Sequence, residues 1–122
     1  MVSKNIHHST IAEISTLIAQ RELSPVDLIK SHLERIRELE PELNSFITIL
    51  ENESLLEAQK AESEIISEGS RGSLHGIPVG LKDLYYTKGV RTTIGSNIMS
   101  SFTPNKDATV TKKLRKAGAI II

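Results

Sequence analysis

The chain has 122 residues, with 15 Lys and Arg against 15 Asp and Glu, so its formal net charge is zero. This length fits one domain or part of a larger one. Apolar residues make up 39% and charged residues 25%, which is typical of a folded globular protein and excludes a disordered tail. The balanced charge argues against a general nucleic-acid binder. The absence of cysteine excludes disulfides, a thiolate nucleophile and Cys-ligated zinc.

The same observations bear on location. No apolar run approaches the roughly 18 residues that a membrane span needs, and the first residues carry no secretory signal. A chain without cysteine suits the reducing cytoplasm. We therefore expect a cytoplasmic protein that does not insert into a membrane.

Two amphipathic helices are expected near the N-terminus. Thr10 and Glu13 have the spacing of a capping box, which predicts a helix that ends near residue 20. Ser24 followed by Pro25 is typical of a helix start, with a capping hydroxyl and a proline at the first helical position. We expect Pro41 to end this second helix.

A strand and a third helix are expected next. Phe46–Leu50 is short and rich in β-branched residues, which predicts a strand. The period then indicates a helix over Glu53–Glu68, whose glutamate-rich outer face is interpreted as solvated. The residues expected to face inward are Leu55, Leu56, Ala61, Ile65 and Ile66.

The second half of the chain has a different composition. After a Gly- and Ser-rich loop at 69–73, Ile77–Leu81 predicts a short strand, which Pro78 confines to a strand start or a sheet edge. Residues 84–106 show no period and predict a long irregular segment. Because loops of that length inside compact domains are usually functional or disordered, this segment is a candidate for function.

A fourth helix and a last strand follow. We expect Asp107 to cap the helix and Gly118 to occupy the position just after its end. Ala119–Ile122 reads as the start of a buried parallel strand covered on both faces. We expect this chain to lack the neighbours that would cover it, and so to be the N-terminal piece of a larger α/β domain.

Lys82 is the candidate for chemistry. It follows a short apolar strand and precedes a loop, where α/β enzymes commonly place functional residues, and a buried lysine can act as a base. From periodicity alone, a lysine that simply reaches water is the simpler interpretation. Asp83 is expected to stabilise a turn or accept a backbone hydrogen bond. The histidines His7, His8, His32 and His75 are too scattered to predict a metal site.

The basic residues of the last helix, from Lys112 to Lys116, lack interleaved aromatic residues, so they are interpreted as a solvated face. The glycines form neither a dinucleotide-binding motif nor a phosphate-binding loop. We therefore expect no cofactor, no metal and no direct contact with nucleic acid.

Several motifs, in order along the chain, resemble the amidase signature family. They are ELSPVDL at 22–28, RI at 35–36, LNSF at 43–46, LHGIPVGLKD at 74–83, TKGVRTT at 87–93, GS at 95–96, DATV at 107–110 and LRKAGAII at 114–121. The resemblance covers nearly the whole chain. It implies one incomplete amidase domain over 1–122, with a mostly helical front at 1–68 and the start of the catalytic core at 74–122.

The resemblance also implies a chemistry. The family cleaves amides with a serine–cis-serine–lysine triad on a mixed sheet flanked by helices, and Lys82 stands at the position of the catalytic lysine. The implied positions of both serines and of the oxyanion-hole loop lie beyond residue 122. Ser96, Ser100 and Ser101 do not match them. We therefore expect residues 1–122 to carry the general base without the nucleophile.

Three functions stay open. The first is a stand-alone amidase that acts on a small amide, either as a monomer or as a homodimer. The second is the glutamine-cleaving subunit of the tRNA-dependent amidotransferase, its A subunit, which releases ammonia from glutamine and works with partner subunits. That protein usually has Asn where this chain has Leu84, which favours the first function. The third is a non-catalytic remnant whose helical front serves as an interaction module.

Overall fold

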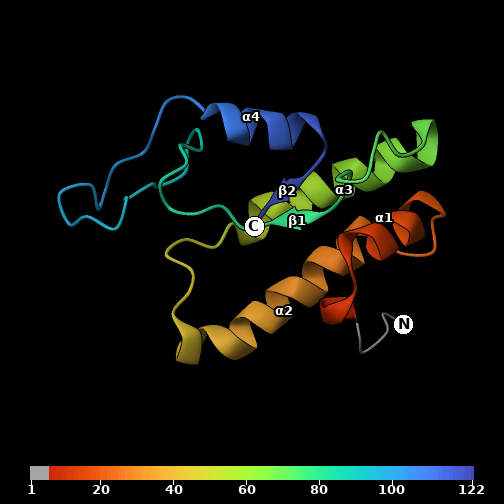
Figure 1. Ribbon diagram of the computed structural model, residues 1–122, viewed down its shortest axis with the longest axis horizontal. Helices are drawn as coiled ribbons and strands as arrows, with labels where there is room; N and C mark the ends of the chain where they lie inside the picture. Colours follow the sequence, from red (N-terminus) through yellow and green to blue (C-terminus); the bar gives the residue numbers. More distant parts are fainter. Residues whose placement is uncertain (1–5) are drawn as a thin grey trace.

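The computed structural model describes residues 6–122, and its elements form helical layers around two short parallel strands. Figure 1 shows α4 on one side of the strands and α1 and α2 on the other, while α3 packs against α2 and β2. This arrangement is the expected α/β class with a helical front. Among the described residues, no helix is both long and apolar enough to cross a membrane.

The first helices begin where their capping residues predict. A short 3-10 turn, Ile6–His8, precedes α1, Ile11–Ala19. The Thr10 hydroxyl accepts a hydrogen bond from the Glu13 backbone N–H at 3.2 Å, and Glu13 Oε2 accepts from the Thr10 N–H at 2.7 Å. The predicted capping box is therefore confirmed. It satisfies backbone donors that a helix start otherwise leaves unpaired.

Helix α2, Pro25–Leu43, is longer than predicted. The Ser24 hydroxyl caps its start, as expected, by accepting from the N–H of Val26 at 3.0 Å. The expectation that Pro41 ends this helix is wrong, because Pro41 lies inside its last turn. A proline removes only one donor, and near a helix end the freed carbonyl can be hydrated. The helix ends instead at Asn44, which adopts a left-handed conformation with φ 47°.

The prediction of a strand over Phe46–Leu50 is wrong. This segment is irregular, and it pairs with no strand in the part of the chain that the structure describes. Two side-chain contacts with the end of α2 account for its path. Glu40 Oε1 accepts from the Phe46 backbone N–H at 2.8 Å, and Glu40 Oε2 accepts from the Ser45 hydroxyl at 2.8 Å. The β-branched composition alone does not make a strand, because a strand needs a neighbour for its hydrogen bonds.

Helix α3, Glu51–Glu68, confirms part of the predicted inward face, because Ala61 and Ile65 are buried and Leu55 packs against the core. Leu56 is 66% exposed and Ile66 is 57% exposed, so their expected inward positions are wrong. The residues that α3 buries are Ser54, Ala58, Ala61 and Ile65. These recur at helical spacing, and the small side chains of Ser54, Ala58 and Ala61 let α3 pack against α2.

Strands β1, Pro78–Val79, and β2, Ile120–Ile121, pair in parallel. Both are shorter than predicted, and Pro78 stands at a strand start, as its missing N–H requires. The Ile120 N–H donates to the Ile77 carbonyl at 2.8 Å. The expectation that Ile120–Ile122 lacks cover is wrong. These residues are at most 7% exposed, and Ile120 and Ile122 join a core cluster with α2 and α3.

Helix α4, Thr109–Lys116, follows the long segment and leads into β2. The expectation that Asp107 caps it is wrong: the helix starts after Ala108, without a side-chain cap. The Asp107 carboxylate instead accepts from the Lys88 backbone N–H at 2.6 Å. Gly118 follows the helix with φ 88°, as predicted for a residue in this place.

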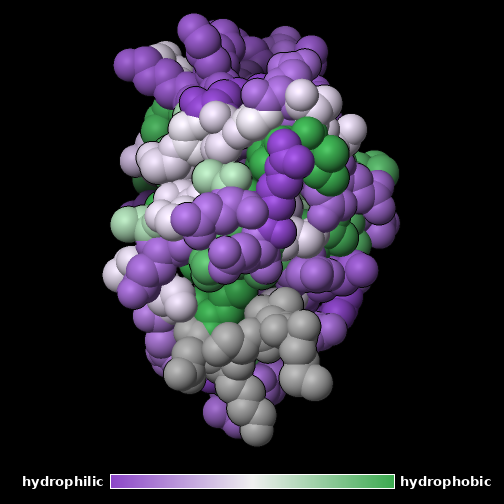
Figure 2. Space-filling view, turned by 90° about the vertical axis from the view of Figure 1, so that its right-hand side faces the viewer, coloured by the Kyte–Doolittle hydropathy of each residue, from purple (hydrophilic) through white to green (hydrophobic). Residues whose placement is uncertain are grey.

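The helical end of the molecule is mostly polar. Figure 2 views the side formed by α1 and the end of α3 and shows a largely hydrophilic surface with smaller hydrophobic areas. Scattered apolar residues on a surface are ordinary and do not by themselves mark a binding face.

Candidate active-site cleft beside Lys82

A cleft of about 730 Å³ lies where β1 ends. Its walls come from three stretches that are distant in sequence, within 45–50, 80–95 and 121–122. The lining is mainly apolar, and its charged side chains are Lys82, Asp83 and Arg91. A concave, mostly apolar site with a few convergent polar groups is the form that small-molecule sites usually take.

Lys82, the predicted site residue, lines this cleft three residues after the end of β1. Its side chain is exposed. Its backbone carbonyl accepts from the N–H groups of Leu84 at 2.7 Å and Tyr85 at 3.1 Å, so the chain turns sharply after it. The structure thus presents the lysine amine to an open cleft on a fixed turn.

Asp83 makes the hydrogen bonds that the sequence predicts for it. Its carboxylate accepts from the backbone N–H of Thr93 at 2.9 Å and of Gly95 at 3.4 Å, and also from the Thr93 hydroxyl. Burial raises the pKa of Asp83, but these hydrogen bonds and the nearby Arg91 charge outweigh it and lower the pKa from its usual value. Asp83 is therefore an ionised acceptor.

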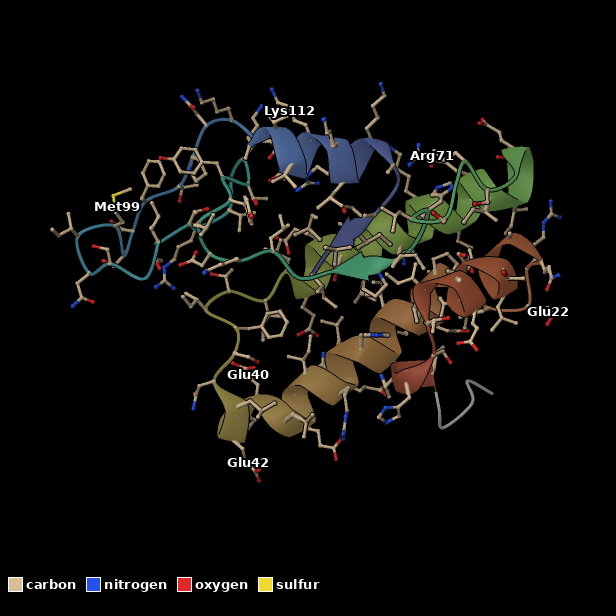
Figure 3. All side chains as sticks on the ribbon, in the orientation of Figure 1. Glu22, Glu40, Glu42, Arg71, Met99 and Lys112 are labelled. Carbon is tan, nitrogen blue, oxygen red and sulfur yellow. The ribbon has the colours of Figure 1, made fainter. Side chains whose placement is uncertain are left out.

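The irregular segment between β1 and α4 is held by many internal bonds. The Gly89 N–H donates to the Pro104 carbonyl at 3.0 Å, and Arg91 Nε donates to the Ser100 carbonyl at 2.6 Å. Thr111 on α4, which is fully buried, donates its hydroxyl to the Tyr86 carbonyl at 3.0 Å. Figure 3 shows Met99 at the outer part of this segment, away from the strands. The segment is thus long but ordered.

Within residues 6–122, Ser45 is the one serine that lines the cleft. Ser96, Ser100 and Ser101 are not among the residues that line the cleft. Ser45 does line it, but its hydroxyl donates to Glu40, which Figure 3 places at the end of α2. Within the described residues the cleft therefore contains a candidate base and no serine positioned as its nucleophile.

The histidines have structural partners. His75 is 2% exposed; its Nε2 lies 3.1 Å from Glu64 Oε2, and its Nδ1 accepts from the Arg71 N–H at 3.2 Å. Burial and the Arg71 charge lower the pKa of His75, against the opposing effect of Glu64. Arg71 lies between α3 and α4 (Figure 3), so this cluster ties the loop to the helices.

The other histidines lie near the start of the chain. His7 packs edge-on against His32, with ring centroids 5.1 Å apart, and His8 is exposed. No group of three or more metal-ligating side chains occurs within residues 6–122.

Sequence reasoning missed one wall of the cleft. Thr92, Ile94 and Gly95 line it, and Arg91 joins them. These residues belong to a stretch without helical or strand period, so periodicity gave no signal for them. The signals that the sequence offers there are the irregular composition of 84–106 and the two motifs at 87–93 and 95–96, which mark the stretch without giving its path.

Comparison with known proteins relates this arrangement to one family. The Amidase family model matches residues 27–122. The A subunit of glutamyl-tRNA(Gln) amidotransferase is 42% identical over 117 residues in Methylococcus capsulatus and 43% identical in Gluconobacter oxydans. These alignments cover 96% of this chain and 24% and 23% of the relatives.

Solved structures give the same relation. The peptide amidase from Stenotrophomonas maltophilia is 32% identical with a TM-score of 0.87, over 93% of this chain and 24% of that enzyme. An amidase family protein from Bacillus anthracis is 31% identical with a TM-score of 0.88, over 98% and 24%. The chain thus spans about a quarter of the length of the proteins it matches.

Proposed function

This chain belongs to the amidase family, and from that premise we propose that it carries the general base of an amide-cleaving enzyme, Lys82. The observation that carries the proposal is the position of Lys82: it lines a cleft at the end of a parallel strand, on a turn fixed by two backbone hydrogen bonds. The carboxyl ends of such strands are where α/β folds usually bind ligands.

The proposed reaction is acyl transfer from an amide. Neutral Lys82 takes a proton, through a bridging serine, from a nucleophilic serine, whose oxygen attacks the amide carbonyl. The proton passes to the leaving nitrogen, ammonia or an amine departs, and water then releases the acyl group. Both serines belong, in this proposal, to the three-quarters of the family's length that this chain does not span.

The environment of Lys82 fits a site that this chain forms together with the rest of an amidase domain. A lysine acts as a base only when it is uncharged, and a surrounding of low dielectric constant favours that form. Lys82 is exposed to solvent in a mainly apolar cleft. The proposal therefore assigns the cover over this cleft to the rest of the amidase domain, with residues 1–68 as its helical front and 74–122 as the start of its core.

A first experiment uses a grafted amidase, in which residues 1–122 replace the segment of the Stenotrophomonas peptide amidase that they match. We expect the graft to release ammonia from a peptide amide. Lys82→Met should lower turnover by about 10²–10⁴-fold, the usual contribution of a general base. Lys88→Met is the matched control, because Lys88 is an exposed lysine of the same segment that does not line the cleft. Turnover that survives Lys82→Met would refute the proposal, as would an inactive graft of a working host.

A second candidate function is the glutamine-cleaving component of an amidotransferase with partner subunits. The higher identity to the amidotransferase proteins, 42–43% against 31–32% for the amidases of known structure, favours it. Leu84 favours the first candidate, a cytoplasmic amidase for a small amide, alone or as a homodimer. Grafting residues 1–122 into the Methylococcus protein distinguishes them. Ammonia release from glutamine that requires the partner subunits supports the second function.

A further inference from the structure

One carboxylate organises the wall of the cleft next to Lys82. The Asp83 side chain accepts from the backbone N–H of Thr93 at 2.9 Å and of Gly95 at 3.4 Å, and from the Thr93 hydroxyl. The Asp83 carbonyl accepts from the Ile94 N–H at 2.9 Å. A single residue therefore binds each of the three successive residues 93–95.

The turn that Asp83 holds is strained. Ile94 has φ 56° and Gly95 has φ 65°, both in the left-handed region. Glycine adopts this conformation readily, whereas a β-branched residue does so rarely and at a cost in energy. Such a conformation persists only where neighbouring groups impose it. Here the hydrogen bonds to Asp83 hold the turn, together with the Gly95 N–H that donates to the Thr93 hydroxyl at 3.2 Å.

The same residue adjoins the proposed base. Lys82 precedes Asp83 in the chain, and its carbonyl accepts two hydrogen bonds in the turn that follows. Lys82, Ile94 and Gly95 all line the cleft. The Asp83 carboxylate accepts from three donors of this turn, so most of its lone-pair sites are used within the fold.

We infer that Asp83 is a positioning residue, which fixes the backbone of Lys82 on one side and the strained 93–95 wall of the cleft on the other. This inference rests on the proposed function. Its consequence is geometric: without the carboxylate, residues 93–95 relax, and the lysine and the cleft wall lose their relative placement. Small misplacements of catalytic groups reduce rates strongly, while substrate binding elsewhere in the cleft is less affected.

Three variants of the grafted amidase test this inference. Asp83→Asn places an amide N–H₂ where the carboxylate accepts, and Thr93→Val removes the hydroxyl donor. Both should lower kcat by about 10–100-fold with KM changed by less than about threefold. Thr93→Ser keeps the donor and should retain the kcat of the unsubstituted graft. All rates are divided by the concentration of folded enzyme. Thermal unfolding followed by circular dichroism gives the folded fraction of each variant without reference to activity.

The outcomes separate the inference from the proposed function. If Asp83→Asn keeps the parent kcat while Lys82→Met is inactive, Asp83 has no positioning role. If Thr93→Ser loses as much activity as Thr93→Val, the hydroxyl bond does not matter and the inference is overturned. Survival of activity in Lys82→Met refutes the proposed function itself.

Hydrogen exchange on residues 1–122 gives a measurement that does not need turnover. Asp83→Asn should raise the exchange rates of the Thr93 and Gly95 amides by at least about tenfold, since it replaces a carboxylate oxygen that accepts from this turn by an N–H₂ group. The Ile120 amide, which donates to the Ile77 carbonyl, serves as the control and should keep its rate. Unchanged rates at Thr93 and Gly95, or an equal rise at Ile120, would overturn the inference.

Discussion

Replacing Gly118 by alanine should destabilise this chain severely, for reasons that can be read from the turn between α4 and β2. Gly118 has φ 88°, a conformation that L-residues with a side chain rarely adopt. An added Cβ would lie 2.7 Å from His75 Cδ2, 2.9 Å from the His75 Cα and 3.1 Å from Arg71 Nε. The contact with the His75 Cα is the decisive one, because backbone cannot rotate away as a side chain can.

The chain contains a matched control for the backbone contribution. Gly69 has φ 87°, nearly the same as Gly118, but an added Cβ there meets nothing within 4 Å. Gly69 has ψ 170°, a backbone region that residues with a side chain rarely adopt, so Gly69→Ala should cost about 1–3 kcal/mol. Gly118→Ala adds steric overlap to its own backbone penalty of about 1–2 kcal/mol, and the overlap typically costs about 1–3 kcal/mol, giving about 2–5 kcal/mol together. That is a large part of the roughly 5–15 kcal/mol that holds a typical domain folded.

Urea unfolding of the three chains, followed by circular dichroism, measures these differences. The order of stability should be the parent chain, then Gly69→Ala, then Gly118→Ala. Equal free energies of unfolding for the two variants would refute the reasoning, because they would show that the close contact with His75 relaxes at no cost.

Three further predictions concern other parts of the molecule. Thr111→Val removes one of two donors to the Tyr86 carbonyl, which keeps the Ala108 N–H at 2.7 Å, so it should lower the free energy of unfolding by about 0.5–1.5 kcal/mol, measured by urea titration. Burial lowers the pKa of both His7 and His75, so the unfolded chain binds protons more readily. Stability should be complete above the unfolded value of about 6.5 and decline as pH falls below it, so the urea midpoint at about pH 5.5 should be lower than at about pH 7.5; equal midpoints would contradict this. Residues 1–122 alone should release no ammonia from amides, and turnover that survives stringent purification would show that the nucleophile lies within them.

Local signals predicted the fold where the interactions themselves are local. The capping hydroxyls of Thr10 and Ser24 act on backbone groups two or three residues away, so their spacing was sufficient. The strand expected at Phe46–Leu50 depended on a distant partner that does not exist in this structure. The helix-breaking effect of Pro41 was overestimated. One lost hydrogen bond at a helix end costs little free energy when water can replace it.

The residues of the candidate site also differ in how far local sequence signals predict them. Lys82 could be found because it follows an apolar strand and stands within a recognisable motif. The wall at residues 91–95 gave no periodic signal, because the turn around Ile94 follows hydrogen bonds to Asp83, which is distant from it in the sequence. The glycines and threonines around it indicate only that the backbone bends, and they do not reveal which carboxylate holds the bend.

The parallel pairing of β1 with β2 has a consequence for the order in which the molecule folds. Pro78 pairs with Ile120, so the two strands can form hydrogen bonds only when the whole segment between them has closed into a loop. Helices α2 and α3 meet through a short connection and lose little chain entropy by doing so. The helical pair therefore forms early and offers a surface on which the strands dock. The cleft beside Lys82, whose walls come from both sides of that closure, is then among the last features to form.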